Sequence, residues 1–504
     1  MTDVIARRGM AATSHPRAVA AAVACLEAGG NAADAAVCAA AVLCVVEPMS
    51  TGVGGDAFAL VYRNGQLTGL NASGRAPARA DPDALGAEMP FTGPQSVTVP
   101  GAVAGWQALL ERHGTWGLDR CLADAIDAAT NGFTVTPVIA DAWGRTAADL
   151  AAYDEAARVF LPPPTAGTTW RNPDLAATLK RIAAEGPDGF YRGPVAAAIA
   201  SATWLEEADL AGVQADWVEP LRLGFGDVTV CELPPNGQGA AALQAMGIAR
   251  DLDLGALADA DRVHVQAEAM KLAFADAYRY IADEPLPAGY LDEAYLAGRR
   301  GQIDLARAGD PGPGDLPHGG TVYLTVVDRD RMACSFIQSI YIGFGSRVVA
   351  PGTGVMLQNR GGCFTLEAGH PNRLAPSKRP FHTIIPGMLL DRAGDALVGP
   401  FGLMGGHVQP QGHLQLLTNL RYRGLGPQAA LAAPRWRLDQ DSDGWLLCLE
   451  PGLWHVADDL ERRGHRVWRD PEPNSYGGGQ AIMLRGDELV GGSEPRKDGL
   501  AAGY

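Results

Sequence analysis

The sequence has few of the features that mark secreted, metal-binding or disulfide-rich proteins. Its cysteines are scattered, with no CxxC pair and no metal-type spacing. Most of them stand in apolar runs, as small core residues do. This pattern predicts free thiols in a reducing cytoplasm and no metal site. The eight are Cys25, Cys38, Cys44, Cys121, Cys231, Cys334, Cys363 and Cys448.

The sequence also lacks an apolar run long enough to span a membrane. The most apolar stretch, "AADAAVCAAAVLCVVEP", is shorter than the roughly 20 residues that a span requires. Asp34 and Glu47 lie near its two ends. Because it is apolar on all sides, it predicts a helix buried in the core. The N-terminal "MTDVIARRGMAATSHP" has no apolar h-region, so we expect no secretory signal and no membrane partner.

Basic residues are too few to balance the acidic ones. The 504 residues include 41 Lys and Arg against 57 Asp and Glu, which gives a net charge of −16 and a pI of about 5.1. An acidic surface repels phosphate backbones, so a nucleic-acid partner is not expected. The 47% of hydrophobic residues is sufficient for a large core.

Hydrophobic periodicity predicts a helix-rich first part and a strand-rich second part. Helices are expected at residues 16–28, with Asn31 as the N-cap of the next one, and over most of residues 100–210. Asn64-Gly65 predicts a hairpin turn. Further predictions are a helix in "ADRVHVQAEAMKLAFADAYRYIAD", strands in "FHTIIPGMLL" and "WLLCLE", and an exposed linker in "LARAGDPGPGDLPHGG". This alternation favours a layered sandwich.

The stretch "PHGGTVYLTVVDRD", residues 317–330, raises the question of a catalytic threonine. "TVYLTVVD" and "MACSFIQSIYI" flank the polar turn "RDR", which predicts a β-hairpin. With the turn centred on Asp330, Thr321 falls opposite Ser339 on the same face, with Cβ atoms about 5 Å apart. A slip of one residue would send Ser339 to the other face. The sequence therefore predicts two hydroxyls at the open end of a hairpin.

A threonine in this place has a chemical use if the chain is cut before it. Breaking the Gly320–Thr321 bond would give Thr321 an α-amine with a reference pKa of about 8. Such an amine can act as base toward its own hydroxyl. Preceding glycines allow the strained geometry that self-cleavage requires. On this segment alone, a simple Gly-Gly turn that enters a strand is the better explanation, because Gly-Gly turns are common.

Five motifs in order along the chain resemble the γ-glutamyltransferase family of N-terminal-nucleophile hydrolases. They are "SHPRAVAAAVACLEAGGNAADAAVCAAAVLCVVEPMSTGVGGD", "LPPNGQG", "KRPFHTIIP", "LMGG" and "SEPRKDGLAAGY". The resemblance implies an α+β fold, the four-layer αββα sandwich, made as an inactive precursor. It also implies self-cleavage into a large segment, residues 1–320, and a small segment, residues 321–504, which stay associated as one αββα domain.

The resemblance also implies roles for individual residues. Thr321 takes the place of the nucleophile, and Ser339 takes that of the hydroxyl that orients and activates it. Gly405 and Gly406 in "LMGGH" match the paired glycines whose backbone N–H groups form the oxyanion hole. Donors of this type contribute roughly 3–4 kcal/mol to catalysis. Without the resemblance, these two glycines would be interpreted as a turn.

The part of the family pattern that binds a glutamyl α-amine is not retained. In the family an aspartate just before the Phe of an "NNQxxDF" stretch binds this amine. Here the stretch reads "LQNRGGCF", so Cys363 stands at the aspartate position and Arg360 at the glutamine position. A neutral thiol is a poor partner for an ammonium, and Arg360 would repel one.

The positions that bind the glutamyl α-carboxylate in the family differ as well. His382 and Thr383 in "KRPFHT" replace a Ser-Ser pair, and Tyr341 replaces the asparagine that follows the activating hydroxyl. The carboxylate-binding arginine would fall at Ser73, with Arg75 two residues later. Arg360 and Arg75 remain candidate carboxylate ligands because guanidinium forks match that geometry.

These departures predict an amidohydrolase for a small acyl amide that carries a carboxylate but no α-amine. The pattern is most similar to the family branch that includes oxamate amidohydrolase. Thr321 Oγ would attack the amide, and water would hydrolyse the acyl-enzyme. A competing interpretation of Arg360 is an ion pair that holds a loop.

Two other functions stay open: a γ-glutamyltransferase or glutathione hydrolase with a rebuilt binding site, and an uncut, non-catalytic homologue. The intact Thr321, Ser339 and paired glycines argue against the second. His407 and His413 in "HVQPQGH" have no HExxH-type support, so no metal is expected. "GVGGD" lacks the G-x-G-x-x-G spacing, so no nucleotide cofactor is expected. Glu47 and Asp56 are candidate buried polar anchors.

Overall fold

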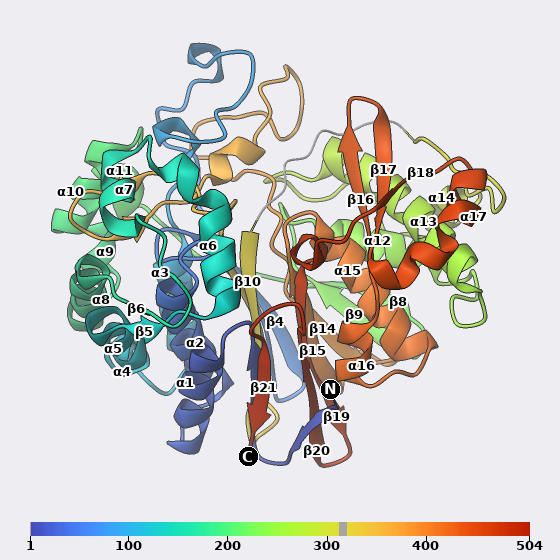
Figure 1. The fold of residues 1–504 in the computed structure, drawn as a ribbon, viewed down its shortest axis with the longest axis horizontal. Coiled ribbons are helices and arrows are strands. Elements are labelled where there is room, and N and C mark those ends of the chain that lie inside the picture. Colours follow the sequence, from blue (N-terminus) through green and yellow to red (C-terminus); the bar gives the residue numbers. More distant parts are fainter. Residues whose placement is uncertain (1, 312–319) are drawn as a thin grey trace.

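The computed structural model describes residues 2–311 and 320–504, which form two seven-stranded antiparallel sheets packed face to face (Figure 1). The first sheet has the order β1 (Val4–Ala6), β20 (Glu488–Ser493), β19 (Gly478–Arg485), β15 (Leu397–Met404), β14 (Gly387–Asp391), β9 (Val228–Glu232) and β8 (Leu221–Phe225). The second has the order β21 (Leu500–Gly503), β2 (Met10–Thr13), β10 (Gly320–Val327), β11 (Ala333–Tyr341), β3 (Asp56–Arg63), β4 (Gln66–Ala72) and β7 (Asp216–Val218).

Three clusters of buried hydrophobic side chains join four layers. One lies between the sheets and includes Phe58, Tyr323 and Ile337. A second packs the second sheet against the helices α1 (Pro16–Glu27), α2 (Ala32–Val46), α3 (Ala102–His113), α5 (Ala123–Asn131) and α8 (Pro173–Glu185). A third packs the first sheet against α12 (Gly239–Ala249), α13 (Asp259–Tyr280) and α15 (Val408–Leu417). The predicted α+β class and four-layer αββα sandwich are confirmed, and Figure 1 shows the two helical layers on opposite sides of the strands.

The remaining elements are shorter or peripheral. The helices are α4 (Leu118–Cys121), α6 (Pro137–Leu150), α7 (Asp154–Phe160), α9 (Asp188–Tyr191), α10 (Gly193–Ala202), α11 (Glu207–Ala211), α14 (Glu293–Arg300), α16 (Pro427–Ala432) and α17 (Ala457–Arg462). The strands are β5 (Phe133–Thr134), β6 (Thr169–Trp170), β12 (Val349–Ala350), β13 (Val355–Met356), β16 (Trp436–Asp441), β17 (Gly444–Leu449) and β18 (Arg466–Arg469). The helical character predicted for residues 100–210 is confirmed.

Helix α2 is the apolar helix that the sequence predicts, and all 15 of its residues are buried. The Asn31 side chain caps it by accepting hydrogen bonds from the backbone N–H groups of Ala33 and Asp34. In return, the Asp34 carboxylate accepts from the backbone N–H of Asn31. This capping box satisfies amides that would otherwise be unpaired. The helix packs against α1, α5 and β10, so it supports the strand that begins next to Thr321.

The β10–β11 hairpin has the predicted register. Val322 pairs with Gln338 and Val327 with Ala333, and a bulge shifts the pairing before Val322 so that Gly320 pairs with Tyr341. The hairpin occupies the centre of its sheet, where β2 flanks β10 and β3 flanks β11. Strands from before and after residue 320 are therefore hydrogen-bonded neighbours within one sheet.

Two local expectations need correction or lie outside the described residues. The strand predicted at residues 381–390 begins only at Gly387. The expectation was wrong for its first half because those residues make contacts with other elements, such as the hydrogen bond from Ile385 N to Gln409 Oε1. Half of the predicted linker at residues 305–320, the range 312–319, lies outside the described residues.

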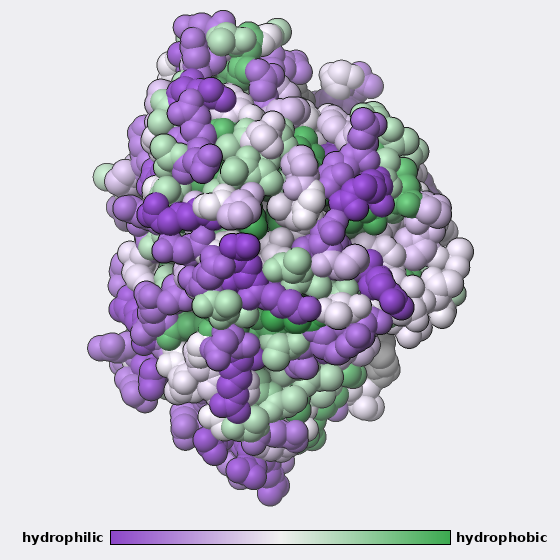
Figure 2. All heavy atoms as spheres, turned by 90° about the vertical axis from the view of Figure 1, so that its left-hand side faces the viewer, coloured by the Kyte–Doolittle hydropathy of each residue, from purple (hydrophilic) through white to green (hydrophobic). Residues whose placement is uncertain are grey.

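All eight cysteines are free thiols, and only Cys363 is partly exposed. In the ranges 2–311 and 320–504, no helix combines the length and the apolar character that crossing a membrane requires. On the face formed by the helices on the left of Figure 1, hydrophilic residues are interspersed with hydrophobic ones (Figure 2).

Candidate active site

Thr321 lies next to the first residue of β10, and only 2% of it is exposed. Its hydroxyl donates to Ser339 Oγ at 3.3 Å and accepts from Gln409 Nε2 at 3.4 Å. Ser339 Oγ in turn accepts from the Tyr341 backbone amide at 2.8 Å. The two hydroxyls that the sequence places opposite each other are therefore in contact, within a buried polar network.

The bulge at the open end of the hairpin positions this pair. The pairing shifts between Gly320 and Val322, and Tyr341 has φ +80°, a region that non-glycine residues rarely adopt. This conformation turns the Tyr341 amide back toward Ser339 Oγ. Bulges commonly re-aim side chains next to active sites. Burial raises the pKa of the Tyr341 hydroxyl well above its usual range, so it stays neutral.

Gly405 and Gly406 lie between the end of β15 and the first turn of α15. Their φ angles of +128° and +60° favour glycine, and a Cβ on Gly405 would stand 3.0 Å from Gly477 Cα. Neither amide donates a hydrogen bond to any residue that the structure describes. Both N–H groups are thus available to an anion, and the positive end of the α15 dipole adds to their potential.

The side chain of Gln238 binds the turn that contains Gly406. Its Nε2 donates to the Gly406 carbonyl at 2.8 Å and to the Thr383 carbonyl at 2.5 Å. The side chain is fully buried, and it comes from the "LPPNGQG" motif just before α12. This bond ties the predicted oxyanion turn to the segment that precedes β14.

Arg360 is a fully buried guanidinium beside the two hydroxyls. Nη1 donates to Thr383 Oγ1 at 2.9 Å, Nη2 donates to Ser339 Oγ at 3.5 Å, and the guanidinium carbon lies 4.1 Å from the Tyr341 ring centroid. Within residues 2–311 and 320–504 it forms no ion pair, and its Nε has no hydrogen-bond partner. A buried cation without a counter-ion is costly unless a ligand supplies the anion.

Cys363 ends the short 3-10 helix that Arg360 begins. Its Sγ lies 3.8 Å from Arg360 Nη1, and burial raises the pKa of the thiol. A neutral thiol offers no charge to an ammonium group. This agrees with the loss of the amine-binding aspartate noted from the sequence.

His382 is a buried, neutral side chain that binds Asp56. Its Nε2 lies 3.1 Å from Asp56 Oδ2, while Nδ1 accepts from Ile384 N at 3.3 Å, so the proton belongs on Nε2. Burial lowers the pKa of His382 to about 3. Asp56 Oδ1 also accepts hydrogen bonds from the backbone of Gly101 and from Gln358 Nε2. Asp56 is therefore the buried polar anchor that the sequence suggests.

Arg75 lies away from this network. Its Nη1 is 3.0 Å from Asp283 Oδ2 and 3.0 Å from the Ser377 carbonyl, and its side chain is 39% exposed. Ser73, which takes the position of the family's arginine, is buried and donates to Asn71 Oδ1. The structure thus brings Arg360, but not Arg75, into contact with the Thr321–Ser339 pair.

The histidines in "HVQPQGH" do not form a cluster. His413 Nδ1 lies 2.7 Å from Glu232 Oε1, and the His407 ring stacks on Phe381 with centroids 6.0 Å apart. What the sequence analysis misses in this motif is Gln409, which reaches Thr321. Its position three residues after the paired glycines, at the start of a helix, is the signal that could have identified it.

A different trio of side chains, His264, Glu268 and His465, has spacing that could hold a metal ion. However, His264 Nδ1 lies 2.8 Å from His465 Nε2, and Lys271 Nζ lies 2.8 Å from Glu268 Oε1. The Lys271 ammonium already neutralises the carboxylate. Glu268 Oε2 also accepts from the Gly309 amide, so both carboxylate oxygens of Glu268 already have partners.

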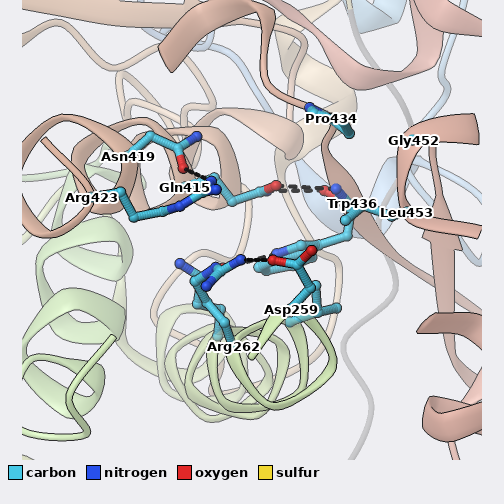
Figure 3. Close-up of a pocket in the computed structure, with 11 residues that line it drawn as sticks. Asp259, Arg262, Gln415, Asn419, Arg423, Pro434, Trp436, Gly452 and Leu453 are labelled. Carbon is cyan, nitrogen blue, oxygen red and sulfur yellow. Dashed lines mark hydrogen bonds and ion pairs between the residues drawn. The ribbon is translucent and has the colours of Figure 1, made fainter. Parts of the chain in front are cut away.

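A pocket with a cavity volume of about 90 Å³ lies apart from the Thr321–Ser339 pair and its partners (Figure 3). Arg262 in this pocket pairs with Asp259, and Arg423 donates to Asn419 Oδ1 at 2.8 Å. Because its polar groups bind one another and no candidate catalytic residue lines it, the pocket is not the candidate active site.

Comparison with known proteins gives a consistent result. The profile of the gamma-glutamyltranspeptidase family matches residues 18–504. The oxamate amidohydrolase proenzyme of Klebsiella pneumoniae is 36% identical over 99% of each chain, and the acylase ACY 1 proenzyme of a Pseudomonas species is 34% identical over 98% of this chain and 93% of its own. The crystal structure of cephalosporin acylase from Bacillus halodurans superposes with a TM-score of 0.94 at 41% identity, covering 100% of this chain and 97% of that one.

Proposed function

The chain belongs to the gamma-glutamyltranspeptidase family, as an amide hydrolase of the N-terminal-nucleophile type, and from this premise we propose that it hydrolyses a small amide that carries a carboxylate. Oxamate is the first candidate substrate, because the Klebsiella pneumoniae relative is named as its amidohydrolase. The proposed nucleophile is Thr321, exposed when the chain cuts itself after Gly320.

The observation that carries this proposal is the buried guanidinium of Arg360, which forms no ion pair with any residue that the structure describes. It lies 3.5 Å from Ser339 Oγ, which itself contacts Thr321 Oγ1 at 3.3 Å. If the carboxylate of a substrate binds Arg360, an acyl carbon one or two bonds from that carboxylate would face the Thr321 hydroxyl. Charge-assisted bonds of this kind are among the strongest that a protein offers to a carboxylate.

The proposed self-cleavage begins with attack by Thr321 Oγ on the Gly320 carbonyl carbon. The C–N bond of that peptide breaks as the acyl group moves to oxygen, and water then hydrolyses the ester. The products are a Gly320 carboxylate and a free α-amine on Thr321. That amine is the base that accepts the proton of the Thr321 hydroxyl in each later turnover.

In the proposed turnover on oxamate, Thr321 Oγ attacks the amide carbon, and the Gly405 and Gly406 amides receive the negative oxygen. Collapse of the tetrahedral intermediate expels ammonia and leaves an oxalyl ester on Thr321. Water then releases oxalate and restores the hydroxyl. Two backbone donors at a developing oxyanion supply the main electrostatic stabilisation.

A γ-glutamyl substrate fits these residues less well. Its α-ammonium would meet Arg360, a like charge, and Cys363, a neutral thiol. Two positive charges close together in a buried site disfavour binding. Hydrolysis of glutathione is therefore the second candidate, kept as an outcome of the test.

The proposed large and small segments, residues 1–320 and 321–504, are expected to stay associated after cleavage. Strands from the two segments pair in both sheets: β2 with β10, β3 with β11, β9 with β14, and β1 with β20. Breaking these ladders would leave buried backbone groups unpaired, which is costly.

The first experiment is the intact mass of the purified protein beside Thr321→Ala prepared in the same way. We expect two chains that meet at Gly320 and Thr321 in the wild type and one chain in the variant. The processed protein is then assayed on oxamate and on glutathione side by side. An uncut wild type would overturn the nucleophile, and faster turnover of glutathione would overturn the carboxylate-amide substrate alone.

A further inference from the structure

The side-chain amide of Gln409 is held between a backbone donor and the hydroxyl of Thr321. Gln409 lies in the first turn of α15 and is fully buried. Its Oε1 accepts from Ile385 N at 2.9 Å, and its Nε2 donates to Thr321 Oγ1 at 3.4 Å. Because a backbone N–H can only donate, the first bond fixes which end of the amide faces Thr321.

We propose that Gln409 is a further catalytic residue, whose N–H stabilises negative charge on Thr321 Oγ. This inference rests on the proposed role of Thr321 as nucleophile, but not on the identity of the substrate. The hydroxyl has one proton, given to Ser339, and two lone pairs, of which one accepts from Gln409. The other lone pair is left to attack a carbonyl carbon.

The bond matters most when Oγ is a leaving group. In an acyl-enzyme, Oγ is an ester oxygen and a weak acceptor. When water attacks the ester carbon and the C–Oγ bond breaks, Oγ takes the electron pair and becomes a strong acceptor, before a proton restores the hydroxyl. A donor that binds the departing oxygen more strongly than the ester lowers this barrier. The ester formed from Gly320 during self-cleavage breaks in the same way.

Other glutamines of α15 have different partners, which makes them useful controls. Gln411 is also fully buried, but its Nε2 donates to the carbonyls of His407 and Leu438, and its Oε1 accepts from Leu438 N. Gln411 therefore links α15 to β16 and does not contact Thr321. Gln411→Leu is matched to Gln409→Leu in residue type, helix and burial.

The test measures self-cleavage of the full chain after pulse labelling in cell-free translation. We expect Gln409→Leu to cut itself about 100- to 1,000-fold more slowly than the wild type, as loss of one oxyanion-hole donor does. The uncut protein is expected to contain the ester, which hydroxylamine cleaves at Gly320. Thermal unfolding first shows that both variants are folded. The self-cleavage rate of Gln411→Leu is then expected to lie within about threefold of the wild-type rate, because this variant leaves the Thr321 contacts in place.

Gln409→Glu gives a readout that a structural role would not move. One carboxylate oxygen can still accept from Ile385 N, but the other can donate to Thr321 Oγ only when protonated. Its self-cleavage is therefore expected to quicken as the pH falls, relative to the wild type at each pH. A pH-independent ratio, or Gln409→Leu that cuts as fast as the wild type, would overturn the inference.

The outcomes separate this inference from the proposed function. Slow cutting by Gln409→Leu together with no turnover of oxamate by the wild type would overturn only the substrate. Normal cutting by Gln409→Leu with turnover of oxamate would overturn only the role of Gln409. A wild-type chain that stays uncut would overturn both.

Discussion

Thr321 Oγ1 lies 3.3 Å from Ser339 Oγ although 18 positions separate the two residues in the chain. The hairpin register brings them together, and each hydroxyl has a further partner: Arg360 donates to Ser339 Oγ, and Gln409 donates to Thr321 Oγ1. The contact joins the predicted nucleophile on β10 to a hydroxyl on the neighbouring strand, β11. The pair is therefore the natural first target for mutation.

Ser339→Ala is expected to slow self-cleavage by about 100-fold, because it removes the acceptor that orients the Thr321 proton. This is the lower end of the roughly 10²–10⁴-fold that general acid–base groups contribute. Ser339→Thr retains a hydroxyl and is expected to cut close to the wild-type rate. The fraction of two-chain protein against time measures both. Equal rates for Ser339→Ala and the wild type would show that the hydroxyl is not needed.

Arg360→Ala is expected to lower kcat/KM for oxamate far more than for oxamide, its neutral counterpart. Removing one partner of a buried charge pair costs about 2–5 kcal/mol, which corresponds to roughly 30- to 5,000-fold. The variant also loses the contact with Ser339, which affects both substrates equally. The measured quantity is therefore the ratio of the two losses.

Arg360→Lys is the matched control for this ratio. It keeps the positive charge but loses the planar fork, so an intermediate preference for oxamate is expected. A uniform loss on both substrates in Arg360→Ala would contradict the carboxylate role and leave Arg360 as a residue that only orients Ser339.

Local signals in the sequence are sufficient for the hairpin and for the buried helices. The alternation of "TVYLTVVD" and the polar turn set a register that the structure retains from Val322 to Val327. The Asn31 cap and the apolar run after it define α2. In each of these cases the partners lie within a few turns or one hairpin of each other, so periodicity and turn chemistry specify them.

The contacts that complete the candidate site come from tertiary packing, and no local pattern specifies them. Gln358 reaches Asp56 across 302 positions, and Gln409 reaches Thr321 across 88. The same packing explains why residues 381–386 are not a strand: their backbone and side chains bond to Gln409 and Arg360 in place of a neighbouring strand. The pairing of Arg75 with Asp283 is equally invisible in the sequence.

Asp56→Asn is expected to destabilise the protein by about 1–3 kcal/mol, the cost of a mismatched buried polar group. His382 Nδ1 already accepts from Ile384 N, so Nε2 must donate. An amide NH₂ opposite that Nε2 would place two donors together, or its oxygen there would leave the backbone amide of Gly74 without an acceptor. Urea unfolding measures the change. Asp56→Asn with unchanged stability would contradict the anchor role.

Glu47→Gln is expected to stabilise the protein, and more so at pH 8 than at pH 5. Burial raises the pKa of Glu47 from 4.5 to about 7, while the unfolded chain keeps the lower value. Between these pH values the folded state binds more protons, so wild-type stability falls as the pH rises through this window and stays lower above it. A glutamine does not ionise, and its oxygen can still accept from Ser14 Oγ. The gain is at most about 3 kcal/mol.

Glu494→Gln is the matched contrast, because it changes another buried glutamate in the opposite sense. The arginines Arg435 and Arg496 overcome the burial of Glu494 and lower the pKa of its carboxyl, so ionised Glu494 stabilises the fold at pH values above its unfolded pKa. This contribution is lost as the pH falls through the lowered folded pKa. Glu494→Gln is thus expected to destabilise the protein at pH 8, where it leaves two buried guanidinium groups short of one charge, and to cost less at pH 4. Denaturant unfolding measures the signs, for Glu47→Gln at pH 5 and 8 and for Glu494→Gln at pH 4 and 8. The same sign for both variants at pH 8 would contradict the assignment of Glu47 as a buried carboxyl without adequate pairing.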